Sequence, residues 1–411
     1  MYDLLITGGN LFYKDAPVDI GKDIAIKDGI IVKVADNIDT GLAEKVIDAS
    51  GKLIVPTFMD THMHIDKAFT MDDDDTVSLI AACNNSDRQD IKYFDWTDEQ
   101  IYDEIMEHSS RVVEMCIAHG TTLIKTNLLF TPNWKTIALD AMMDLKKKYK
   151  GYCEVLNGVS FPDEFREELL RATADGKTDY IAGYPHLTPD HAACTDDCFN
   201  IAREFNLPVD LHCDESDCIN LDCFRYIIKK TKECHMEGLV TCGHVTGLNA
   251  NKMPEEMAAE AIKEAAEAKM NVTSLTACNM YLMNATRRGP TRVRQLVEAG
   301  VNVAVASDNI RDTFRPFGNC DLLEEALTTA QVHKFGTSEW LHRTMEFITY
   351  NAAKNAVAKD YGLGEGCKAD LNILDADTPE LAIINKAKRL FVIKDGNVIA
   401  RDGVIDRSFM K

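Results

Sequence analysis

The sequence predicts an α/β protein: a TIM-type (β/α)8 barrel with a small β-sandwich domain that is formed by both ends of the chain. Three observations support this fold class. Eight apolar runs in the middle of the chain each end in polar residues, and the last six begin about 30 residues apart. The segments between these runs carry helix signals, and both termini carry strand-and-turn patterns.

The spacing of the apolar runs is the main reason for expecting a barrel. The last six runs begin at residues 153, 180, 208, 239, 270 and 301, which matches the length of one βα unit. A doubly wound sheet would need a glycine-rich phosphate loop after its first strand, and none is present. The expected barrel strands are Leu53–Met59, Thr122–Lys125, Cys153–Val159, Tyr180–Gly183, Pro208–Leu211, Leu239–Cys242, Met270–Leu275 and Val301–Ala306.

Two of the intervening segments show how the expected helices begin and end. Thr97–His119 has apolar residues at helical spacing and stops at Gly120. A second helix should open at Pro290 and close at Gly300, because proline is favoured at the first helical position and glycine just after the last.

Strand patterns recur at the two ends of the chain. The turns Asp28-Gly29 and Asp395-Gly396 lie between apolar runs and predict β-hairpins. We therefore expect residues 1–55 and 364–411 to form one β domain and residues 56–363 to form the barrel. The expected strands of the β domain are Asp3–Thr7, Asp23–Lys27, Ile30–Val34, Ala369–Leu374, Arg389–Ile393 and Asn397–Ala400.

Composition and charge narrow the possible partners and compartment. The 411 residues carry a formal net charge of −21, which disfavours binding to nucleic acid or to anionic membranes. No apolar stretch approaches the roughly 18–20 residues of a membrane span. The first residues lack a basic region followed by an apolar run, so we expect a cytoplasmic protein whose 13 cysteines are reduced.

Polar residues at the predicted strand ends indicate a metal centre, since the C-terminal ends of barrel strands carry the active site. His62 and His64 are two residues apart, so both side chains project from one face of a strand. His212 and Asp308 end two other predicted strands at the same rim. Three imidazoles and a carboxylate suit one divalent ion of borderline hardness, zinc or ferrous iron.

Two further polar residues are expected beside this metal. Glu215 lies three residues beyond His212, where a carboxylate can move protons between water and substrate. His244 ends the next predicted strand and either faces the same water or is a hydrogen-bonded barrel histidine.

With these residues the chain resembles the amidohydrolase superfamily, and within it the cytosine deaminase-like branch of heterocycle aminohydrolases. The resemblance covers nearly the whole chain. The resemblance implies one metal rather than two. Relatives with two metals usually have a carboxylated lysine at the end of the fourth strand, whereas this chain has Gly183–His186 there, without a lysine. Further similar segments are Gly120–Thr122, Phe161-Pro162, Pro316–Asn319 and Gly362–Leu371.

The resemblance also implies a reaction, the hydrolytic deamination of a small nitrogen heterocycle. The metal activates water, His244 orients it, Asp308 accepts its proton, and Glu215 protonates a ring nitrogen and then the leaving amine. The alternative within the same superfamily is hydrolysis of a cyclic amide at a ring C–N bond. The resemblance and the acidic charge also favour a homo-oligomer.

Two departures from cytosine deaminases suggest a substrate other than cytosine. Asp163 stands where those enzymes have a glutamine, and an ionised aspartate only accepts hydrogen bonds. Asn309 replaces the second aspartate that commonly follows the metal ligand. We therefore expect a substrate edge that is rich in N–H donors, or a cation.

Three more residues are expected near the substrate. Phe314 falls where the family often has an aromatic ring, and it either stacks on the substrate or packs in the core. Lys67 either contacts substrate or pairs with Asp66, and His186 closes the fourth predicted strand and can line the pocket.

Overall fold

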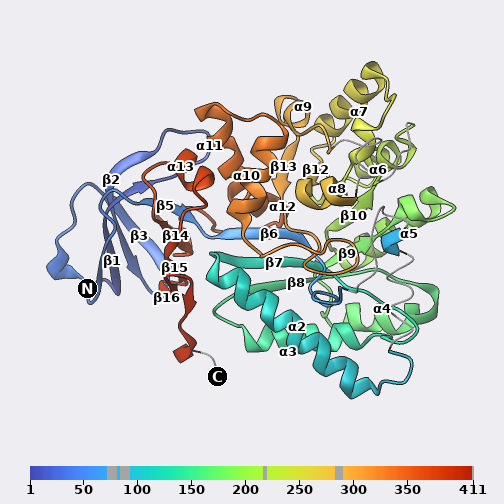
Figure 1. The fold of residues 1–411 in the computed structure, drawn as a ribbon, viewed down its shortest axis with the longest axis horizontal. Coiled ribbons are helices and arrows are strands. Elements are labelled where there is room, and N and C mark those ends of the chain that lie inside the picture. The colour runs from blue at the N-terminus through green and yellow to red at the C-terminus, as the bar shows by residue number, and fades with distance from the viewer. Residues whose placement is uncertain (72–80, 84–92, 216–219, 283–289, 410–411) are drawn as a thin grey trace.

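The computed structural model describes residues 1–71, 81–83, 93–215, 220–282 and 290–409, and these residues form two β-sheets with surrounding helices. An eight-stranded parallel barrel fills most of the molecule, and a separate sheet is built from both termini (Figure 1). The predicted α/β fold class, a barrel with a β domain made from both ends, is confirmed.

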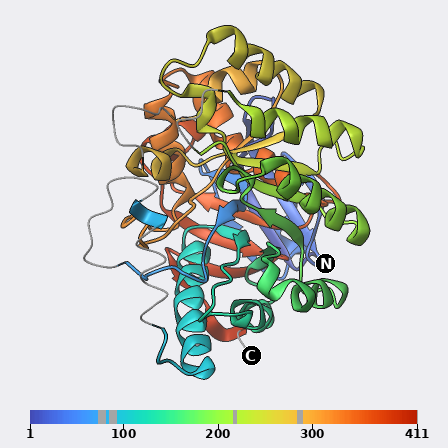
Figure 2. The same cartoon turned by 90° about the vertical axis from the view of Figure 1, so that its right-hand side faces the viewer.

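The barrel strands follow one another in sequence order, and each pairs in parallel with the next. Helices lie around the barrel in both views (Figures 1 and 2). The strands are β6 (Phe58–Met63), β7 (Thr121–Asn127), β8 (Glu154–Val159), β9 (Tyr180–Gly183), β10 (Val209–Cys213), β11 (Val240–His244), β12 (Asn271–Ser274) and β13 (Asn302–Val305).

Helices connect successive barrel strands or follow the last one, and they bury one face against the barrel. The helices of this layer are α2 (Asp98–Ala118), α3 (Ile137–Lys148), α4 (Arg166–Ala174), α5 (His191–Phe205), α6 (Asp222–Glu233), α7 (Glu255–Glu267), α8 (Thr276–Leu282), α9 (Val293–Glu298), α10 (Leu322–Val332), α11 (Ser338–Phe347) and α12 (Tyr350–Asn355). Short 3₁₀ turns are η1 (Thr40–Leu42), η2 (Asp163–Phe165), η3 (Pro185–Leu187), η4 (Thr246–Asn249) and η5 (Arg407–Phe409).

The helix starts follow from local hydrogen bonding. Thr97 and Gln100 form a capping box at the start of α2, in which each side chain accepts a hydrogen bond from the other residue's backbone N–H. The helix that was expected between Pro290 and Gly300 is present as the shorter α9, which begins three residues after the proline.

The first expected strand is divided between the two sheets. Leu53–Pro56 forms β5 of the terminal sheet, whereas the barrel strand β6 begins only at Phe58 and continues through His62. The apolar run Leu53–Met59 was predicted to be one strand, but the chain passes from one sheet to the other at Thr57. Apolar residues continue through this point because both strands are completely buried.

The terminal sheet joins strands from both ends of the chain side by side (Figure 1). Its order is β17-β16-β15-β14-β5-β1-β2-β3, with β4 paired to β1, and one apolar cluster holds Ile6 and Ile24 together with Leu371 and Ile393. Helix α13 (Pro379–Ile384) follows β14. The strands are β1 (Leu4–Leu11), β2 (Asp19–Lys27), β3 (Ile30–Ala35), β4 (Val46–Asp48), β5 (Leu53–Pro56), β14 (Leu371–Leu374), β15 (Arg389–Lys394), β16 (Asn397–Arg401) and β17 (Val404–Ile405).

Among the described residues, a single bridge joins the first barrel strand to the segment after the last one, near the end of the barrel that carries the histidines. Met63 on β6 forms a single parallel bridge with Asp308, and the Asp308 N–H donates to the carbonyl oxygen of His62 at 2.9 Å. The Ser307 N–H also donates to Asp60 Oδ1 at 3.1 Å. Barrel closure therefore brings residues of β6 against the segment after β13.

Two further observations concern the helices and the cysteines. Within the described ranges, no helix combines the length and apolar character that a membrane crossing requires. The twelve cysteines that the structure describes are all free thiols.

Candidate metal centre and active site

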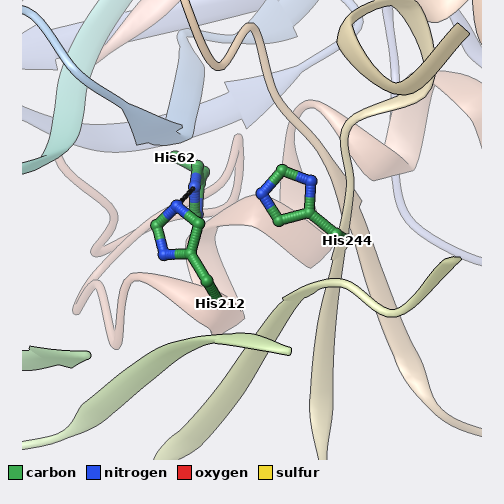
Figure 3. Close-up of side chains that lie close together, drawn as sticks. All are labelled: His62, His212 and His244. Carbon is green, nitrogen blue, oxygen red and sulfur yellow. Dashed lines mark hydrogen bonds between the residues drawn. The ribbon is translucent and has the colours of Figure 1, made fainter. Parts of the chain in front are cut away.

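Three imidazole nitrogens meet at one point inside the C-terminal end of the barrel. His62 Nε2 lies 3.1 Å from His212 Nε2, and His64 Nε2 lies 3.2 Å from the same atom. Figure 3 shows the rings of His62 and His212 turned toward each other, with His244 beside them. The predicted convergence of His62 and His64 from one face of a strand is therefore found in the structure.

Asp308 completes this group from the opposite side of the barrel seam. Its Oδ1 lies 3.6 Å from His64 Nε2, and the ligand atoms of His62, His64 and Asp308 lie within 4.8 Å of one another. Neither carboxylate oxygen of Asp308 accepts an N–H or O–H hydrogen bond from the described residues. Because buried carboxylates normally have such partners, these free oxygens suit a cation.

The four side chains fit a divalent metal ion. Two nitrogens that each lie 2.0–2.1 Å from one zinc ion are about 3 Å apart, as these nitrogens are. His64 Nδ1 lies 3.2 Å from the carbonyl oxygen of Asn127, so the Nδ1 hydrogen has an acceptor and the Nε2 lone pair points into the site.

Burial keeps the imidazoles in the form that binds metal. Desolvation lowers the pKa values of His62, His64 and His212 well below 6.5, so the rings are neutral near pH 7. Desolvation raises the pKa of the Asp308 carboxyl to about 7, although the nearby Cys278 thiol and Lys67 act in the opposite direction. A bound cation would favour the ionised carboxylate.

Two of the polar residues stand on unusual backbone. His244 and Asp308 have φ values of 67° and 63°, in the left-handed region that few non-glycine residues adopt. Val245 also has a positive φ of 48°, which is strained for a β-branched residue. Strain of this kind persists where the surrounding structure holds it, and here it coincides with the polar cluster.

Gly243 makes room for one of the imidazoles. A Cβ atom at Gly243 would lie 2.9 Å from His62 Cε1 and 3.2 Å from His62 Nδ1. Real Cβ atoms essentially never approach a neighbour within 3.0 Å, so the His62 ring occupies space that only glycine leaves open.

A second polar cluster lies beside the metal site. His244 Nδ1 is 3.3 Å from Glu215 Oε1, and the Asn279 amide donates to Glu215 Oε1 at 3.2 Å. The same Asn279 Nδ2 lies 3.0 Å from His244 Nδ1. When Nδ1 accepts this hydrogen bond, the neutral ring carries its hydrogen on Nε2, which Figure 3 shows facing His62 and His212.

A pocket opens over both clusters, and four of the expected substrate residues line it, namely Lys67, His186, Asn309 and Phe314. Lys67 Nζ lies 3.7 Å from the centre of the Phe314 ring and 3.6 Å from Asp312 Oδ2. Asp66 instead accepts a hydrogen bond from the Leu129 backbone. Apolar side chains line the remaining wall, including Leu129, Tyr184, Leu187 and Leu282.

Two of these lining residues are held by neighbouring groups. His186 Nδ1 lies 3.0 Å from the carbonyl oxygen of His212. The Asn309 amide donates to Asp312 Oδ2 at 2.6 Å, and its oxygen accepts from the Cys278 thiol at 3.7 Å. Asn309 therefore uses its amide to hold the loop after β13.

Asp163 differs from the other expected substrate residues. It begins η2, is exposed, and does not line the pocket that the described residues form. Its place in substrate binding stays a prediction.

Sequence reasoning missed three residues of the site: Asn279, Gly243 and Tyr184, whose ring centre lies 4.4 Å from that of His212. Asn279 lies on α8 rather than at a strand end, so the rule that located the histidines does not reach it. Gly243 directly precedes His244, and a glycine inside a buried strand is the available signal for close approach.

Known proteins share this chain's sequence and fold. A family model described as amidohydrolase family matches residues 162–400. The chain is 31% identical to the N-isopropylammelide isopropyl amidohydrolase of Pseudomonas sp. (strain ADP), with 98% of each chain covered. It is 27% identical to the pterin deaminase of Rhizobium rhizogenes, over 92% of this chain and 88% of that protein.

A solved structure shows the same architecture. The crystal structure of 5-methylcytosine deaminase from Klebsiella pneumoniae with 5-fluorocytosine superposes with a TM-score of 0.85. The alignment covers 97% of each chain at 23% identity, which supports a common fold. The chain therefore belongs to the amidohydrolase family, and it is a hydrolase that acts on carbon–nitrogen bonds.

Proposed function

We propose that the protein is a metal-dependent aminohydrolase that removes an exocyclic amine from a small nitrogen heterocycle. One observation carries the proposal: the Glu215 carboxylate, with the His244 ring 3.3 Å away, lines the same pocket as His64, His212 and Asp308. A carboxylate this close to a site suited to activating water supports a role for Glu215 in proton transfer.

His62, His64, His212 and Asp308 would hold one divalent ion, zinc or ferrous iron. When bound, such an ion supplies a water molecule whose pKa is lowered from 15.7 toward about 7. The acidic net charge of −21 supports a small uncharged or locally polar substrate over nucleic acid or anionic lipid.

The remaining chemistry is assigned to the chain's own groups. The Asn279 amide donates to His244 Nδ1, so the ring carries its hydrogen on Nε2. This Nε2–H would donate to the oxygen of the attacking water and orient it. Asp308, whose carboxylate oxygens accept no N–H or O–H hydrogen bond from the described residues, takes up a proton there. Glu215 then passes protons to a ring nitrogen and to the departing amine, while Asn279 holds its Oε1.

Atoms balance in this reaction. Water adds its oxygen to the ring carbon, the exocyclic C–N bond breaks, and the amine leaves with the two hydrogens of water shared between the products. The ring nitrogen keeps the proton that Glu215 gives it. The new hydroxyl group loses its proton to Glu215, which passes it to the amine as the C–N bond breaks, and the proton held by Asp308 then restores Glu215 for the next cycle. No oxidant or reductant takes part.

The pocket favours a ring that presents oxygen acceptors. Lys67 is 8% exposed and offers only N–H donors, while Phe314 and Tyr184 provide aromatic surface. Because Asp163 is exposed and does not line the described pocket, the pocket wall supports an oxo-substituted ring more than the N–H-rich edge or the cation that the sequence suggested. N-isopropylammelide, which bears ring oxo groups and an alkylamine, has this chemistry and is the substrate named for a relative.

An amine-release screen tests the proposal. Zinc-loaded and ferrous-loaded protein would be incubated with N-isopropylammelide, pterin, cytosine and 5-methylcytosine, and products would be separated by mass spectrometry. The proposal expects free amine or ammonia with an intact ring, and loss of this activity in Glu215→Gln at unchanged metal content. Opening of the ring with the amine retained would overturn it in favour of cyclic-amide hydrolysis.

A further inference from the structure

A buried ion pair lies beneath the metal ligands inside the barrel. The Lys125 ammonium on β7 donates to Asp210 Oδ2 on β10, and also to Asn355 Oδ1 at 3.0 Å. The Asn355 amide in turn donates to Thr273 Oγ1 at 3.0 Å. Lys125 is 4% exposed and Asp210 is 1% exposed, so both charged groups are almost completely buried.

The second oxygen of this carboxylate faces a metal ligand. Asp210 precedes His212 by two residues on the same strand, so both side chains point into the barrel. Asp210 Oδ1 lies 3.9 Å from His62 Nδ1. Neither atom has a hydrogen-bond partner among the described residues.

The chemistry of an imidazole ligand explains why these two atoms face each other. A neutral ring that offers its Nε2 lone pair to a metal carries its hydrogen on Nδ1, and that hydrogen needs an acceptor. The carbonyl oxygen of Asn127 fills this role for His64 at 3.2 Å. For His62, the facing acceptor is Asp210 Oδ1, and a small movement of the ring toward it would complete the hydrogen bond.

We propose that Asp210, held in place by Lys125 and Asn355, is a positioning residue that accepts from His62 Nδ1–H and thereby sets how tightly the site holds its metal. This inference rests on the proposed metal site. Lys125 fixes the Asp210 carboxylate through Oδ2, which leaves Oδ1 free for the ring. The ion pair thus acts through His62 and does not contact substrate.

The chain offers a matched control pair. Lys394 donates to Asp370 Oδ2 at 2.5 Å, and these two residues line the same cavity of about 800 Å³ as Lys125. Lys394 and Asp370 are both at most 9% exposed. Asp370 lies directly before β14 of the terminal sheet, and its carboxylate accepts hydrogen bonds from Lys394 and from the Asp395 backbone N–H. Breaking this pair removes a buried ion pair without touching His62.

The test compares zinc retention in Asp210→Asn and Asp370→Asn with that of the unmodified protein. Zinc content would be measured by mass spectrometry of the metal, zinc affinity by chelator competition, and folding by thermal unfolding. We expect Asp210→Asn to bind zinc 10–100-fold more weakly, the usual effect of losing such a partner. Asp370→Asn should unfold at lower temperature but hold zinc within about twofold of the unmodified protein.

Two outcomes overturn the inference. One is a zinc affinity in Asp210→Asn equal to that of the unmodified protein, and the other is an equal loss in both variants. If Asp210→Asn does not fold, the double variant Lys125→Met/Asp210→Leu replaces the pair by apolar side chains, which often preserves stability. It should show the same weakened zinc binding. If the unmodified protein binds no zinc, the proposed metal-dependent function is wrong. If it binds zinc and Asp210→Asn binds zinc equally well, only the role proposed for Asp210 is wrong.

Discussion

Substituting Gly243 by alanine should weaken metal binding by displacing one ligand. The new Cβ would stand 2.9 Å from His62 Cε1, whereas ordinary van der Waals contact begins at 3.4 Å. The ring must therefore retreat by about 0.5 Å or the strand must shift. Metal–ligand distances are held to about ±0.2 Å, so this displacement exceeds what the coordination tolerates.

The expected size of the effect is a 10- to 100-fold loss of zinc affinity, or about 1.4–2.7 kcal/mol. Gly243 has no positive φ, so the backbone itself accepts alanine, and the change acts mainly through the His62 ring. The assay is chelator competition for zinc, followed by thermal unfolding to separate metal loss from unfolding.

Gly183→Ala is the matched control. Its Cβ would meet Cys198 Sγ at 2.9 Å and Leu211 Cδ2 at 3.0 Å, which is a similar overlap with different neighbours. Cys198 belongs to α5, so this overlap falls between the barrel and its helix layer. The control should lower thermal stability while zinc affinity stays near that of the unmodified protein. Unchanged zinc affinity in Gly243→Ala would refute the position assigned to His62.

Three further predictions concern the site. Glu215→Gln should lower kcat by about 10²–10⁴-fold at unchanged zinc content, and turnover within threefold of the unmodified protein would remove its proton-transfer role. Zinc affinity should rise with pH up to about pH 7 and then level off, because metal displaces the proton from Asp308, whose pKa is about 7, while the buried imidazoles are already neutral. Chelator competition at pH 5.5 and 7.5 should differ by roughly 30-fold, and a flat profile would contradict this titration. Lys67→Met should raise KM by about 10–100-fold with a smaller change in kcat, as for loss of a charged hydrogen-bond donor; an unchanged KM would remove Lys67 from substrate binding.

The barrel and the convergence of most of the proposed metal ligands could be predicted because their signals are local. A strand places residues two apart on one face, so His62 and His64 had to point together wherever the strand lay. Parallel strands end at one rim, which brought His212 to the same place. The spacing of about 30 residues between apolar runs was enough to predict the barrel without any information on long-range contacts.

The rest of the site depends on packing between distant segments. Asn279 on α8 contacts Glu215, 64 residues earlier in the sequence, and His244, 35 residues earlier. No hydrophobic periodicity in the sequence predicts these contacts. The orphaned oxygen of Asp210 is likewise visible only when β6, β7 and β10 are assembled. Asp163 was singled out by its position after Phe161-Pro162, where cytosine deaminases have a glutamine; it is exposed at η2, and its role in substrate binding stays a prediction.

Oxygen-18 labelling of the product tests the central claim most directly. Zinc-loaded protein would convert the best substrate of the amine-release screen in ¹⁸O-labelled water, and the products would be weighed by mass spectrometry. We expect one ¹⁸O atom in a ring-intact product and one equivalent of released amine. A product that gains labelled water but keeps its exocyclic amine would show ring C–N cleavage and would rule out removal of the exocyclic amine.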